Sequence, residues 1–265
     1  GLDVDDWKPG ETRYVDAKAF GYPFRSLGQV KAGRYRVQAM INSYETFKRC
    51  DGHTVKLPPD KWQGQQFASN PGNLYSRAQN LAIDPSKAGE TPLILDQEIA
   101  PIPDFKQKET KYVKYLRIKS DLLSKFWGRE MFIGAWILLP WGFDEHPSAR
   151  YPLVINHGHF PSSVGNWRET PPDPNLAPDY SERFSLAGYN RIQQQHGWQF
   201  YQDWTGKGFP RMLLVEIQHA TRFYDDSYAV NSANNGPYGD AIMKELVPEI
   251  ERRYRGIGEG WARFT

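Results

Sequence analysis

A short apolar run that ends abruptly in polar residues constrains the fold of this chain most. The stretch Tyr151–Phe160 reads YPLVINHGHF, and its apolar centre Leu153–Ile155 is followed directly by Asn156 and then by His-Gly-His. A bounded apolar run of this length predicts a buried strand. Ligands bind beyond the carboxyl ends of strands in open α/β sheets, so the polar end predicts one edge of a functional site.

Strand-like and helix-like patterns alternate on both sides of this run. After residue 110 we expect strands over Tyr112–Lys119, Glu130–Leu139, Tyr151–Asn156 and Met212–Gln218, and a last strand that begins at Trp261–Thr265. We expect helices over about Trp198–Thr205, where Gly188 and Gly197 leave an earlier start open, and over Pro237–Arg255 with a kink at Pro248. Such alternation predicts an α/β fold with a mostly parallel sheet that is covered by helices on both faces. The first two strands are expected to form an antiparallel hairpin, with Gly128 in the turn.

The first hundred residues follow a different pattern. Every second residue from Tyr35 to Ile41 is apolar, which is the period of a β-strand, and turn residues are frequent up to Ile99. This pattern predicts a small β-sandwich domain over residues 1–108, with Ile99–Lys108 as the linker. Residues 109–265 then form the second domain.

Composition excludes several classes of partner. The 265 residues include 33 basic and 31 acidic side chains, so the net charge is +2 and no nucleic-acid or membrane-surface partner is expected. The longest apolar stretch, Phe132–Trp141, is far shorter than the ~20 residues of a spanning helix. Cys50 is alone, which rules out an intrachain disulfide and predicts a buried thiol.

Four segments, taken in order, resemble the α/β-hydrolase fold, and in particular the putative-esterase group that includes esterase D and bacterial feruloyl and acetyl-xylan esterases. These segments are Tyr151–Phe160, Arg211–His219, Asp225–Ile242 and Lys244–Arg255. The resemblance covers roughly Lys111–Thr265. It implies hydrolysis of a small-molecule or carbohydrate carboxylic ester by a Ser nucleophile, a His base and an acidic residue, without a cofactor. By analogy with enzymes that act on plant polysaccharides, it also implies a secreted or periplasmic location.

The nucleophile motif of that fold, G-x-S-x-G, is absent from these 265 residues. In the family the motif follows the strand that comes after the helix ending near Arg255, which here is the strand at Trp261–Thr265. We therefore expect the chain to be the first half of an esterase, with the triad beyond Thr265. Its partner would be the remaining C-terminal half, and the chain alone would be inactive.

The resemblance also suggests roles for residues near the polar strand ends. The turn after Asn156 is expected to supply the oxyanion hole through the backbone N–H groups of Gly158, His159 and Phe160. Ser227 is not a candidate nucleophile, because no His stands at the required place in the sequence. The residues expected to line the substrate cleft are His157, Trp167, Asp226, Tyr228 and Asn234.

Three alternatives stay open for these residues. A strand-end turn with Gly158 at positive φ requires no function. A metal-dependent hydrolase could use the His157 and His159 pair, because side chains two residues apart on a strand point the same way. Its further ligands would come from His196, His219, Asp225 and Asp226. The remaining alternative is a non-catalytic carbohydrate-binding or accessory protein that uses the N-terminal sandwich and its aromatic side chains.

Overall fold

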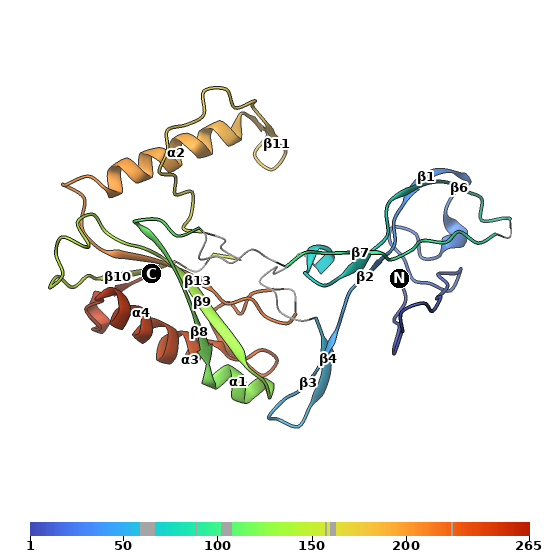
Figure 1. Ribbon diagram of the computed structural model, residues 1–265, viewed down its shortest axis with the longest axis horizontal. Coiled ribbons are helices and arrows are strands. Elements are labelled where there is room, and N and C mark those ends of the chain that lie inside the picture. Colours follow the sequence, from blue (N-terminus) through green and yellow to red (C-terminus); the bar gives the residue numbers. More distant parts are fainter. Residues whose placement is uncertain (59–66, 88, 102–107, 157, 160–162, 224) are drawn as a thin grey trace. The chain divides into compact units, whose positions relative to one another are not determined.

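The computed structural model of this chain forms two compact units. It describes residues 1–58, 67–87, 89–101, 108–156, 158–159, 163–223 and 225–265 (Figure 1). Unit 1 consists of Gly1–Asn42 and Pro71–Ala100, and unit 2 of Ser43–Asn70 and Pro101–Thr265.

Unit 1 is built from short strands, as its sequence pattern indicates. β1 (Gly33–Val37) pairs antiparallel with β6 (Gln79–Ile83). A second small sheet has the order β2 (Met40–Ile41), β5 (Leu74–Tyr75) and β7 (Gln97–Glu98). The apolar alternation that begins at Tyr35 is therefore interrupted between β1 and β2. The β-sandwich over residues 1–108 stays a prediction.

A hairpin that the sequence analysis assigned to the N-terminal domain belongs to unit 2. β3 (Glu45–Lys48) pairs with β4 (Thr54–Leu57), and Phe47 on β3 is 1% exposed. The Phe47 ring packs edge-on against Trp127, with ring centroids 5.5 Å apart. Cys50 lies in the turn of this hairpin and is exposed, so the expectation of a buried thiol was wrong.

Unit 2 contains a mixed sheet with the strand order β16-β10-β13-β9-β8. In chain order these strands are β8 (Val113–Ser120), β9 (Met131–Leu138), β10 (Leu153–Asn156), β13 (Leu213–Gln218) and β16 (Arg263–Phe264). β8 and β13 both run antiparallel to β9, whereas β10 runs parallel to β13 and to β16. The carboxyl ends of β10, β13 and β16 therefore lie at the same end of the sheet.

Helices cover both faces of this sheet. α2 lies on one side of the sheet, and α3 and α4 lie on the other (Figure 1). The helical segments are α1 (Asp121–Trp127), α2 (Tyr189–Trp204), α3 (Tyr238–Ala241), the π-helix η4 (Ile242–Leu246), α4 (Val247–Tyr254) and a last 3-10 turn, η5 (Gly260–Ala262). Two small hairpins lie in the loops: β11 (Tyr180–Ser181) with β12 (Leu186–Ala187), and β14 (Asn231–Ser232) with β15 (Gly236–Pro237). The fold is thus a mixed α/β fold.

Alternation along β9 divides the apolar side chains between two cores. Ile133 and Ile137 contribute to the core shared with α1, α3 and α4, whereas Trp136 contributes to the core under α2. In that second core the indole of Trp204 donates a hydrogen bond of 2.8 Å to the carbonyl oxygen of Leu139. A central strand that is apolar on both faces is typical of a sheet with helices on both sides.

Two helical details differ from the expectations. A helix, α1, stands where the sequence analysis expected only a turn. The Ser120 side chain caps it by accepting a hydrogen bond from Leu123 N, and Gly128 ends it at φ 67°. Where a kink was expected at Pro248, a π-helix, η4, stands just before the proline, which has no N–H to donate to the carbonyl four residues back.

No helix in the described part of the chain has the length and apolar character needed to cross a membrane.

The burial of Phe47 predicts that the β3–β4 hairpin contributes to the stability of unit 2. Phe47→Ala should lower the free energy of unfolding by about 3–5 kcal/mol, because it leaves a cavity beside Trp127. Phe184→Ala is the control, because Phe184 is 51% exposed and its loss should cost less than about 0.5 kcal/mol. Urea unfolding measures both variants, and equal stability of the two would contradict the assignment of the hairpin to unit 2.

Candidate functional site

The pairing of β10 with β13 brings the two polar loops that follow these strands to the same end of the sheet. The strands are in parallel register from Leu153 with Leu213 to Asn156 with Glu216. At the end of this register the Asn156 side-chain amide donates a hydrogen bond of 2.8 Å to Glu216 Oε1. The paired part of the two strands therefore ends in a contact between two polar side chains.

Glu216 is a buried carboxylate beneath the turn that follows β10. It is 5% exposed, and it accepts hydrogen bonds from the Asn156 side chain and from the backbone N–H of Gly165. Burial raises its pKa, and the two hydrogen bonds offset part of that effect. A Cβ added at Gly158 would lie 3.8 Å from Glu216 Oε2, so the turn passes close to the carboxylate.

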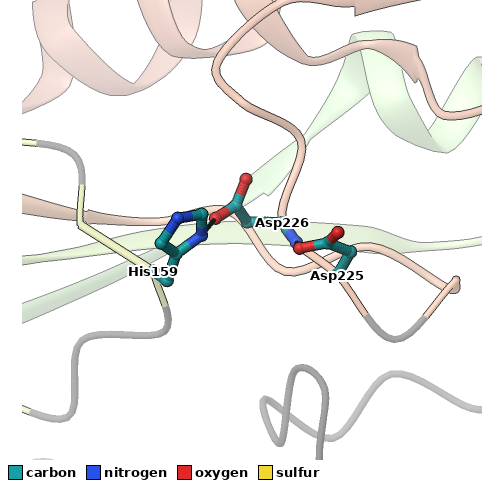
Figure 2. Close-up of side chains that lie close together, drawn as sticks. All are labelled: His159, Asp225 and Asp226. Carbon is teal, nitrogen blue, oxygen red and sulfur yellow. Dashed lines mark hydrogen bonds and ion pairs between the residues drawn. The ribbon is translucent and has the colours of Figure 1, made fainter. Parts of the chain in front are cut away.

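Asp226 pairs with His159 across the two loops. Figure 2 shows the His159 imidazole turned toward the Asp226 carboxylate, and the ion pair joins His159 Nδ1 to Asp226 Oδ2. The Asp226 side chain is 3% exposed, whereas that of His159 is 60% exposed. The backbone N–H of Tyr228 donates a 2.7 Å hydrogen bond to Asp226 Oδ1, and the Tyr228 ring lies edge-on to the imidazole.

The loop that carries Asp226 folds back on the end of β13. Thr221 N donates a 2.7 Å hydrogen bond to the Asp225 carbonyl, and Ser227 N donates one of 3.1 Å to the His219 carbonyl. The Ser227 hydroxyl lies 2.8 Å from His219 Nδ1, and both side chains are buried. The Ser227 side chain is therefore buried and bonded within its own loop.

The His159–Asp226 pair has the arrangement of an oriented imidazole. A carboxylate that engages one ring nitrogen fixes the tautomer and leaves the other nitrogen to accept a proton or a hydrogen bond. Donor atoms of His159, Asp225 and Asp226 also lie within 4.8 Å of one another, so these three residues could hold a metal ion. Three protein ligands and one open position are typical of a catalytic zinc site.

The structure brings only some of the expected site residues together. His159, Asp226 and Tyr228 contact one another, and Gly158 precedes His159 in the same turn. The alternative of a strand-end turn with Gly158 at positive φ stays a prediction, because the φ angle of Gly158 depends on residue 157. His157 and Phe160 lie outside the described residues.

Other residues named from the sequence lie in different surroundings. Trp167 packs against Phe200 and Tyr201 of α2, and Asn234 is exposed in the turn between β14 and β15. Of the two further histidines, His196 is exposed on α2 and His219 is bound to Ser227.

Glu216 and the side-chain contact of Asn156 were not predicted from the sequence. The signal for Glu216 is a charged residue inside the apolar strand LLVEIQ. Carboxylates are almost never fully buried unless they are paired, so such a residue marks a polar contact to be found.

Comparison with known proteins gives little beyond this geometry. No family model and no curated protein matches the chain. A solved structure described as a ferulic acid esterase is similar, with a TM-score of 0.32 and 17% identity over 57% of this chain and 47% of that chain. The chain thus spans about half the length of that structure. So weak a likeness assigns neither a fold nor a function.

The raised pKa of Glu216 predicts a pH-dependent stability. The folded state favours protonated Glu216, so stability should fall as pH rises from the ordinary value of 4.5 through the higher pKa of the folded state. Glu216→Gln should remove this dependence of the unfolding free energy on pH, because the glutamine side chain does not titrate and its hydrogen bonds are the same at every pH. Urea unfolding at a series of pH values measures it.

Glu182→Gln is the matched control, because Glu182 is exposed in the turn after β11. It should change stability by less than about 0.5 kcal/mol and keep the wild-type slope. A Glu216→Gln variant that also keeps the wild-type slope would contradict the assigned cause.

Proposed function

We propose that this chain forms part of a carboxylic ester hydrolase of the α/β-hydrolase type and that it supplies the oxyanion hole. The observation that carries the proposal is the parallel pairing of β16 with β10, in which Leu153 lies opposite Arg263 and Val154 opposite Phe264. A turn that follows β16 would therefore lie beside the turn that follows β10. A nucleophile on one of these turns would then lie close to an oxyanion hole on the other, as the reaction requires.

The order of elements supports the same proposal. β10 is the third strand of the five-stranded sheet along the chain, and the segment after it leads to α2. In the α/β-hydrolase fold, one oxyanion donor is an N–H of the loop between the third strand and the first large helix. Gly158 and His159 occupy that place here, and Glu216 holds residues on both sides of the loop through Asn156 and Gly165.

In this mechanism, the residues of unit 2 would assist the reaction without attacking the ester themselves. A backbone N–H at Gly158 or His159 would donate to the oxygen that becomes negative when the ester carbonyl is attacked. Glu216 would position this turn, and Asp226, His159 and Tyr228 would line the substrate cleft. The nucleophile, base and acid would come from residues after Thr265, because the 265 residues contain no G-x-S-x-G motif.

Hydrolysis of p-nitrophenyl acetate tests where the nucleophile lies. A longer form of the protein that continues past Thr265 should hydrolyse this ester, and a fluorophosphonate should label it at a serine after Thr265. The 265-residue chain should neither turn over the ester nor become labelled. Labelling of any serine within residues 1–265, together with turnover by this chain, would contradict the proposal.

Two substitutions at His159 in the longer form separate the backbone from the side chain. His159→Pro removes the backbone N–H and should lower kcat about 100- to 1,000-fold if this group is the oxyanion donor. His159→Ala keeps the N–H and loses the pairing with Asp226, so its effect on kcat should be much smaller. Equal losses in the two variants would assign the effect to the imidazole.

A metal-dependent hydrolase is a second candidate, favoured by the proximity of donor atoms of His159, Asp225 and Asp226. Such an enzyme would use a metal-bound water in place of a serine. Elemental analysis of the purified chain distinguishes the two candidates. A stoichiometric transition metal that His159→Ala removes would favour the metallohydrolase, and a metal-free chain would oppose it.

A further inference from the structure

A groove separates α2 from the proline-rich segment that precedes it in unit 2. Its volume is about 430 Å³, which falls within the range of roughly 300–1,000 Å³ that is usual for small-molecule sites. The residues that line it come from residues 172–174 and from one side of α2, and those used below are Asp173, Arg191, Gln194, Gln195, Trp198 and Gln199. We propose that this groove binds a carbohydrate chain of β-linked pyranoses.

Hydrogen bonds across the groove hold its two walls together. Gln194 Oε1 accepts a 2.8 Å hydrogen bond from the backbone N–H of Asp173. Arg191 Nε donates a 2.8 Å hydrogen bond to the carbonyl oxygen of Leu176. Two prolines, Pro172 and Pro174, further restrict the wall opposite α2. A site that is built before the ligand arrives loses less conformational entropy on binding.

Trp198 gives the groove an aromatic surface. Its ring stacks on Tyr201, with centroids 5.2 Å apart and an angle of 18° between the planes. Tyr201 covers one face of the indole and holds the ring in place, and the remainder of the indole lines the groove. β-linked pyranoses carry their hydroxyls close to the ring plane, so they present flat C–H faces that pack on an aromatic ring.

The polar groups of the groove suit hydroxyls. A Gln amide both donates and accepts hydrogen bonds, as a sugar hydroxyl does, and Gln194, Gln195 and Gln199 all line the groove. The Gln194 oxygen is bonded to the Asp173 N–H and the Gln199 amide nitrogen to Asp203, so the Gln194 N–H groups and the Gln199 oxygen would face a ligand together with the Gln195 amide. The opposite charges of Arg191 and Asp173 leave the lining close to neutral at pH 7. This balance favours an uncharged, hydroxyl-rich ligand over a phosphate or an acidic peptide.

This inference does not depend on ester hydrolysis. None of the groove residues belongs to the His159–Asp226 pair or contacts Glu216 in the interactions described above. Binding is measured on the 265-residue chain itself, without any catalytic readout. Failure of one proposal therefore leaves the other standing.

Calorimetric titration with hexamers of β-1,4-linked xylose, glucose and mannose tests the groove. At least one hexamer should bind the chain saturably, and Trp198→Ala should weaken that binding about tenfold or more through loss of the stacking surface. Gln195→Ala should weaken it to a smaller extent, and it keeps the hydrogen bonds between the walls. Trp261→Ala is the matched control, because Trp261 is 72% exposed on η5 and does not line the groove.

Three results would overturn the inference. The first is the absence of saturable binding of all three hexamers. The second is binding that neither Trp198→Ala nor Gln195→Ala weakens. The third is binding that Trp261→Ala weakens as much as Trp198→Ala does, since the hexamer would then bind exposed aromatic rings in general and not the groove.

Discussion

The parallel register between β10 and β13 is the constraint on which the site of this protein depends. It places Asn156 opposite Glu216, and thereby brings the turn after β10 to the loop after β13. A shift of one residue would turn Glu216 into the apolar core shared with α3 and α4 and would bury its charge without a partner. The register is therefore fixed by the polar contact at the strand end as well as by the apolar side chains before it.

The two cores of unit 2 pack on opposite faces of β13. Leu213, Val215 and Ile217 face the core that includes α3 and α4, so residues 214, 216 and 218 of β13 face α2. The first part of this second face is apolar, and only Glu216 and Gln218, near the carboxyl end, are polar. The polar side chains of β13 on this face thus lie near its carboxyl end.

Much of unit 2 could be predicted from its sequence, because each strand is a bounded apolar run. β8, β9, β10 and β13 were predicted to within two residues at each end, and so was the antiparallel pairing of β8 with β9. The helix α1 was missed, although Ser120 and Gly128 are suitable caps, because seven residues between two strands also fit a turn. The place of the β3–β4 hairpin was missed because it depends on the contact of Phe47 with Trp127, which no local pattern reveals.

The candidate site was predictable only in part, for the same reason. The polar strand ends were visible in the sequence, but the partners of His159 and Glu216 follow from strand register and loop folding, which bring together residues some 60 positions apart. Asp226 was expected in the cleft, yet its pairing with His159 required the loop that ties His219 to Ser227. Glu216 could have been found from its charge within an apolar strand.

The central claim is that the turn after β10 supplies the oxyanion hole of an ester hydrolase. A crystal structure of a longer form that continues past Thr265, covalently inhibited by an alkyl phosphonate, tests it most directly. The claim predicts a phosphoryl oxygen at about 2.7–3.1 Å from the backbone nitrogen of Gly158 or His159, with the modified serine in the turn after β16. A phosphoryl oxygen bound by other groups, or a modified serine away from the carboxyl end of β16, would contradict it.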